Sequence, residues 1–181
     1  MRSPRILLSL VLLSLSTAAL PQPGSPAAPA SEAKRSFDQL KTLAGNWEGR
    51  ITTIPPQPEV EGKIALVTLR VTSMGNALLH EMHTEDRPDD PITMLYVDGD
   101  RLLLTHYCDA GNRPRMAATM TPDGKTVDFH FLDVANFNSK QGGYMQHAVF
   151  TTLDANHHTE DWTFLAQGKP INAHLDLQRT K

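Results

Sequence analysis

The chain has 181 residues and a formal net charge of −3, from 17 basic and 20 acidic side chains. Its length fits one domain with an extension, and because Lys and Arg form no cluster beyond the N-terminus, we expect no surface for nucleic acid or for an anionic membrane. Cys108 is the single cysteine, which excludes an intramolecular disulfide, and we expect it to be a structural thiol rather than a nucleophile.

The first 19 residues have the composition of a secretory signal peptide. Arg2 and Arg5 precede an apolar run at 6–15, and small residues follow at 17–19. The run is shorter than the about 20 residues that span a bilayer, which favours cleavage over an uncleaved anchor. We therefore predict a secreted or periplasmic protein with no stable membrane span after cleavage. Residues 20–35, rich in Pro and Ala, are predicted to be a disordered linker.

A short amphipathic helix is predicted to open the domain, which spans residues 36–181. Ser36 and Gln39 match a capping box, and Gly45 is a suitable C-terminal stop. Such a short helix is marginal alone, so we expect it to cap the end of the domain that Trp47 enters. Its apolar stripe is Phe37, Leu40 and Leu43.

About ten β-strands with short connections are predicted after this helix. Asp98-Gly99 is a hairpin signal, and the stretch at 136–143 has the composition of a loop. No connection is long enough for a Greek-key crossover, so we predict an all-β, antiparallel up-and-down barrel, with a two-sheet sandwich as the alternative. The predicted strands are 46–53, 60–72, 77–85, 92–97, 100–107, one before and one after the turn at 121–124, 144–153, 158–166 and 171–180.

Strand alternation predicts which side chains face the interior. The two strands around Asp123-Gly124 share an apolar face, and His106 alternates with leucines. If the next hairpin turns at Ala155-Asn156, His147 and Glu160 share one face. The predicted ligand-contacting side chains are Trp47, His106, Met116, Met120, Phe129, Phe131, His147, Glu160, Trp162 and Arg179.

His147 and Glu160 are the candidate catalytic pair. A histidine beside a carboxylate can transfer protons, and it can equally form a hydrogen bond that only satisfies burial. With His106 the two would make a zinc-like triad, but no spacing motif supports it, and we predict no metal site. His130 and His174 are expected on the outer face.

Two features resemble the calycin group of lipocalin-like barrels. Gly45-Asn46-Trp47 matches the G-x-W motif at the start of the first strand, and Arg179 stands where the group places a basic residue across that tryptophan. More narrowly, the chain is similar to uncharacterised secreted bacterial lipocalin-like proteins, with a distant resemblance to nitrobindins and fatty-acid-binding proteins. No histidine matches the haem ligand of nitrobindins, so haem stays an open cofactor.

The resemblance implies a barrel that binds a small apolar or amphipathic molecule in its interior, as a monomer or a homodimer. The alternative is a barrel enzyme, an isomerase or hydrolase, that uses His147 and Glu160 as acid and base. A third alternative is a structural or protein-binding domain with a filled interior.

Overall fold

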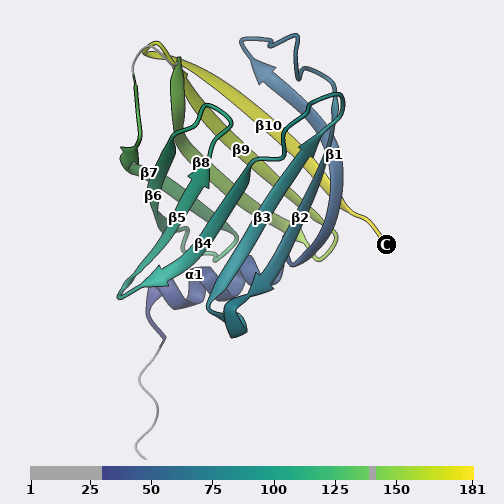
Figure 1. Cartoon of the computed structure of the whole chain (residues 1–181). Helices are drawn as coiled ribbons and strands as arrows, with labels where there is room; N and C mark the ends of the chain where they lie inside the picture. The colour runs from purple at the N-terminus through teal and green to yellow at the C-terminus, as the bar shows by residue number, and fades with distance from the viewer. Residues whose placement is uncertain (1–29, 139–141) are drawn as a thin grey trace, which may run out of the picture.

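The computed structural model of the chain describes residues 30–138 and 142–181 (Figure 1). The predicted signal peptide and residues 20–29 of the predicted linker lie outside this part, as do residues 139–141 of the predicted loop. In the described part, no helix is long and apolar enough to cross a membrane.

Ten antiparallel strands of the described residues close into a barrel, in which each strand pairs with its neighbours in sequence and the first pairs with the last. This confirms the predicted up-and-down barrel and excludes the sandwich. One 3-10 turn, η1 (Ser73–Gly75), connects the second strand with the third. The strands are β1 (Gly45–Ile54), β2 (Ile64–Thr72), β3 (Ala77–Thr84), β4 (Ile92–Asp98), β5 (Arg101–Tyr107), β6 (Arg113–Met120), β7 (Thr126–Ala135), β8 (Gly143–Asp154), β9 (His157–Ala166) and β10 (Lys169–Arg179).

Helix α1 (Glu32–Lys41) begins one turn earlier than predicted. Its N-cap is Ser31, whose hydroxyl accepts a hydrogen bond from the backbone N–H three residues on, at 3.2 Å. Ser36 lies inside the helix and donates its hydroxyl hydrogen to the carbonyl oxygen of Glu32. The predicted capping box of Ser36 and Gln39 is therefore wrong, and the end of the predicted linker is helical. Ser31 is the better cap because an acidic residue follows it directly, at the positive end of the helix dipole.

Helix α1 covers one end of the barrel, the lower end in Figure 1, where it contacts β2, β4, β5 and β6. The stripe of Phe37, Leu40 and Leu43 is buried there, as predicted. Each of these side chains stabilises the docked helix by about 1.5–3 kcal/mol. The side-chain amide of Gln39 donates to the hydroxyl of Thr152 on β8 at 3.2 Å, which fixes the direction of the helix across the opening.

The barrel closes where Trp47 on β1 lies directly opposite Arg179 on β10. The guanidinium carbon lies 4.0 Å from the centre of the indole, which is the predicted cation–π contact. The guanidinium also donates to the carbonyl oxygens of Thr42 and Ala44, at 3.1 and 2.7 Å, which the helix end leaves unpaired. A Cβ on Gly45 would lie 2.3 Å from Arg179 Nη1, so the glycine of the G-x-W motif leaves room for the guanidinium.

The turn between β4 and β5 lies one residue later than predicted. Asp98 pairs with Arg101, so the two loop residues are Gly99 and Asp100. Gly99 has a φ of 63°, which glycine adopts without strain. The predicted turn at Asp98-Gly99 is corrected by one position, and the strands on either side keep their identity.

Strand β8 contains an extra residue near its end. Thr152 pairs with His158 and Asp154 pairs with His157, so Leu153 has no partner on β9. Such a β-bulge offsets the register by one residue, and an offset of one turns each side chain of a strand to the opposite face.

This bulge determines which side chains of β8 face inward. Phe150, rather than Thr151, lies opposite Glu160, and Phe150 is buried in the interior. His147 consequently lies on the outer face, where it contacts Asp128 of β7. The prediction that His147 shares the interior with Glu160 is wrong, and the catalytic pair that it would form does not exist in this structure.

Candidate functional site

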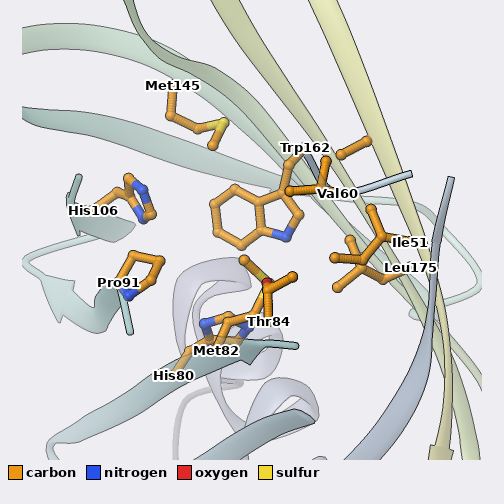
Figure 2. A pocket seen from close by; sticks show the side chains of 11 residues that line it. Ile51, Val60, His80, Met82, Thr84, Pro91, His106, Met145, Trp162 and Leu175 are labelled. Atoms are coloured by element: carbon orange, nitrogen blue, oxygen red, sulfur yellow. The ribbon is translucent and has the colours of Figure 1, made fainter. Parts of the chain in front are cut away.

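A cavity of about 130 Å³ lies inside the barrel, in the half away from α1 (Figure 2). We call it the inner cavity. Its walls are mostly apolar, and the indole of Trp162 stands in the middle of them, with His106 and Pro91 on one side and Ile51 and Leu175 on the other. The lining residues are Ile51, Val60, His80, Met82, Thr84, Pro91, His106, Met145, Trp162, Ala173 and Leu175.

The inner cavity continues towards the open end of the barrel, which we call the mouth. Two further hollows, of about 190 and 440 Å³, share Val60 and Met145 with it. Charged side chains enter their walls, including Arg87 and Asp109, which form an ion pair at 3.0 Å. A molecule in the barrel therefore meets apolar walls inside and charged groups at the mouth.

His106 lines the inner cavity and contributes a neutral imidazole to its wall. Its Nδ1 lies 2.8 Å from the hydroxyl of Thr93, and no described residue bonds to its Nε2. If the hydroxyl donates to Nδ1, Nε2 carries the hydrogen and can donate, and in the other tautomer Nε2 accepts. Burial, and then the charge of His80, lowers the pKa of His106 to about 4. The imidazole is therefore neutral at pH 7.

Below the inner cavity, a buried carboxylate collects three hydrogen bonds. Glu160 Oε2 accepts from His80 Nε2 at 2.9 Å and from the indole N–H of Trp162 at 3.0 Å. Glu160 Oε1 accepts from His158 Nε2 at 3.1 Å. We call these four residues the Glu160 network. It reaches from the cavity wall to the closure of the barrel, because the rings of His158 and Trp47 form a T-shaped pair with their centroids 4.2 Å apart.

The Glu160 network holds a negative charge in the interior. Burial alone would raise the pKa of Glu160, but the charge of His80 and hydrogen bonds from both histidines outweigh it, so the pKa lies well below its ordinary value. The Nδ1 atoms of His80 and His158 are buried and have no hydrogen-bond partner in the described residues. Three hydrogen bonds and complete burial fix this carboxylate in one position. This favours a role for Glu160 in positioning the side chains that donate to it.

The predicted ligand-contacting residues fall into four places. His106 and Trp162 line the inner cavity, and Glu160 lies beneath it. Trp47 and Arg179 belong to the closure. His147 lies on the outer face. The other four stand on β6 and β7, which pair as predicted from Met120 opposite Val127 to Met116 opposite Phe131. Met116 and Phe129 belong to the core and Met120 packs against it, whereas Phe131 is half-buried beside Tyr144.

Sequence reasoning missed several side chains of the site. His80 is not among the predicted site residues, although its alternation with Leu78 and Met82 indicates an inward face. His158 shares the face of Glu160 by the same rule, but its position beside the turn made the direction of its side chain ambiguous from the sequence. With His147 outside, the zinc-like triad of His106, His147 and Glu160 does not converge.

Cys108 lies half-buried at the second hollow, beside Asp109. Burial raises the pKa of its thiol to about 11, so the thiol is protonated at neutral pH. This agrees with the prediction of a structural thiol, since the thiolate is the nucleophilic form.

Haem, which the resemblance to nitrobindins leaves open, needs space for a macrocycle and an axial ligand such as histidine. The larger of the two hollows at the mouth, of about 440 Å³, has no histidine among the described residues that line it. His106 faces the two narrower hollows instead. The larger hollow therefore offers haem no histidine ligand among the described residues.

No protein-family model matches the chain, and no curated protein matches it in sequence. In structure it is similar to Rv2717c from M. tuberculosis, with a TM-score of 0.59 and 16% identity over 81% of this chain and 98% of that one. It is also similar to a protein of unknown function of the DUF3598 family from Nostoc punctiforme PCC 73102, with a TM-score of 0.53 and 10% identity over 78% of this chain and 48% of that one. At these identities the likeness concerns the fold alone, and it agrees with a closed barrel.

Proposed function

We propose that the protein is a non-catalytic, lipocalin-like binding module that holds one small amphipathic molecule inside its barrel. The observation that supports this most directly is the inner cavity, with apolar walls and the imidazole of His106 among its lining side chains. Ligand sites of this kind are mostly apolar and contain a few polar groups that fix orientation.

The volume limits what can enter. An apolar cavity of roughly 150 Å³ in a protein interior holds a molecule the size of benzene, so about 130 Å³ accommodates one ring or a short branched chain. A larger ligand would extend into the wider hollows, where Arg87 and Asp109 offer charged partners. The proposed ligand therefore has an apolar end beneath Trp162 and a polar end at the mouth.

The first test is direct. Native mass spectrometry of the purified protein should show a bound small molecule, and calorimetric titration with fatty acids, aromatic alcohols and haemin should identify the favoured class. We expect uptake of compounds with one ring-sized apolar group, and weaker uptake or none of haemin. An empty barrel that takes up no compound of the panel would contradict the proposal.

A pair of variants places the bound molecule. Ala173→Leu adds bulk to the wall of the inner cavity and should weaken binding, whereas Asn172→Leu adds the same side chain to the outer face of β10 and should not. Both variants must keep the circular dichroism spectrum of the parent. Equal binding by both would mean that the ligand lies elsewhere.

We also propose that this barrel works outside the cytoplasm, because the charged start, apolar run and small residues at 1–19 have the order of a cleavable export signal. Expression of the full chain followed by N-terminal sequencing of the exported protein should give a mature chain that begins near Leu20. Retention of the intact chain in the cytoplasm would contradict this part of the proposal.

A further inference from the structure

The outer face of the barrel carries a cluster of three metal-ligating side chains, Asp128, His130 and His147. We call it the outer histidine cluster. Asp128 and His130 are two residues apart on β7 and so share one face, and His147 on β8 lies directly opposite His130. The bulge at Leu153 puts His147 there, because regular pairing would have turned it inward.

Both imidazoles direct the same atom towards one carboxylate. His147 Nε2 lies 2.5 Å from Asp128 Oδ1, and His130 Nε2 lies 3.6 Å from Asp128 Oδ2. The two rings are stacked, with centroids 5.4 Å apart and an angle of 30° between their planes. One donor atom from each of the three residues lies within 4.8 Å of the other two.

This arrangement differs from the other surface histidines of the described residues. His83, His157 and His174 each contact one aspartate, at 2.7–2.8 Å, and none of these pairs includes a second histidine. In the described part of the chain, only Asp128, His130 and His147 bring three possible metal-ligand atoms within 4.8 Å of one another. Simple pairing of a histidine with an acid therefore does not account for the cluster.

We propose that the outer histidine cluster binds one divalent transition-metal ion of the zinc or copper class, with Nε2 of both histidines and the carboxylate of Asp128 as ligands. Imidazole and carboxylate are ligands that zinc and copper accept, and three protein ligands leave one tetrahedral position for water. The site rests on the outer wall and does not depend on the proposed ligand in the inner cavity.

The distances are compatible with an ion after small side-chain movements. Ligand atoms about 2.1 Å from a tetrahedral ion are about 3.4 Å apart. The contact of His130 with Asp128, at 3.6 Å, already has this length, and the contact of His147 with Asp128 must open by about 1 Å as the ion replaces the hydrogen between the two atoms. The side chains of His147 and Asp128 are 34% exposed, and that of His130 is 58% exposed, which leaves them room to move.

The test uses the full chain without a histidine affinity tag. Calorimetric titration with Zn²⁺ at pH 7.5 should show one ion per chain. His130→Gln, His147→Gln and Asp128→Asn should each weaken binding by more than about tenfold, the lower end of the loss seen for residues that only orient a metal ligand. Because the imidazoles must be neutral to bind, affinity should also fall at pH 5.5.

The matched control is His174→Gln, which removes a surface histidine that contacts Asp161 on the same outer wall but faces no second histidine. Its affinity for Zn²⁺ should equal that of the parent chain. With Cu²⁺, electron paramagnetic resonance should show coordination by two imidazole nitrogens, and by one in His130→Gln. No saturable binding of either ion, or an equal loss in His174→Gln, would overturn the proposal.

Discussion

Glu160 gathers three buried side-chain hydrogen bonds in the interior. Its carboxylate is fully buried and accepts from His80, His158 and Trp162. A buried charge that loses its partners costs about 3–5 kcal/mol, whereas an exposed acid contributes little. The histidines and the indole around Glu160 are therefore positioned by one side chain.

We predict that Glu160→Ala lowers the free energy of unfolding by about 3–5 kcal/mol, because it leaves three buried donors without an acceptor. Urea denaturation at pH 7 measures the change. Asp161→Ala, the next residue along β9, alters an exposed acid and should stay within about 0.5 kcal/mol of the parent. Similar values for the two variants would show that the Glu160 network does not stabilise the fold.

His106 should make the stability of the barrel depend on mild acid. Burial lowers the pKa of His106 from its ordinary value of 6.5 to about 4. Between these two values the unfolded chain binds a proton that the folded chain does not, so stability rises with pH in this window. The contribution of His106 is therefore complete above pH 6.5 and is lost as the pH falls to 4, by about 3 kcal/mol.

Urea denaturation of the parent and of His106→Gln at pH 7.0, 5.5 and 4.5 isolates this contribution. The amide of glutamine does not titrate in this range, so the variant should lose less stability between pH 7.0 and 4.5 than the parent does. The lowered pKa of Glu160 acts in a different window, because the stability that it supplies is lost only below its ordinary value near 4.5. Parallel pH profiles would mean that His106 titrates normally in the folded protein.

At the scale of the element, the bulge in β8 determines which side chains of this strand face the interior of the barrel and which face outward. It turns Phe150 towards the interior and His147 towards Asp128.

Alternation predicted the strands well because one face of each is buried, and the β6–β7 register followed from its turn. Nothing in the residues around Leu153 indicates a bulge, and a second register shift, between Met145 and His147, is equally silent in the sequence. The candidate site was therefore predicted only where strands are regular, as for His106 and Trp162.

We predict that deletion of Leu153 damages the barrel far more than its truncation does. The deletion removes the offset and would force His147 inward and Phe150 outward along β8. Leu153→Ala changes an exposed side chain, 47% accessible, and should stay within about 0.5 kcal/mol of the parent. Thermal denaturation followed by circular dichroism distinguishes the two, and a deletion variant as stable as the parent would show that β8 tolerates either register.

At the scale of the whole molecule, one contact links the helix, the first strand and the last strand. Arg179 lies over Trp47 and donates to carbonyl oxygens at the end of α1. The contact was predicted from the resemblance to lipocalin-like barrels, which place a basic residue of the last strand across this tryptophan. The start of α1 was predicted less well, because serines stand at both ends of its first turn and only the folded helix selects between them.

We predict that Arg179→Met lowers the free energy of unfolding by about 2–3 kcal/mol, from the lost cation–π contact and from carbonyl oxygens left without a donor. Arg179→Lys should recover only part of this, since an ammonium group cannot reproduce the planar fork. Chemical denaturation measures both variants. A lysine variant as stable as the parent would mean that charge alone closes the barrel.

The Glu160 network joins the two tryptophans of the chain, since Trp162 donates to Glu160 and His158 contacts Trp47. One indole thus borders the inner cavity and the other sits at the junction of the first and last strands. Intrinsic fluorescence therefore has a natural reporter at each end of the network. Replacing either indole by phenylalanine would separate a signal for filling of the barrel from a signal for its opening, without any added dye.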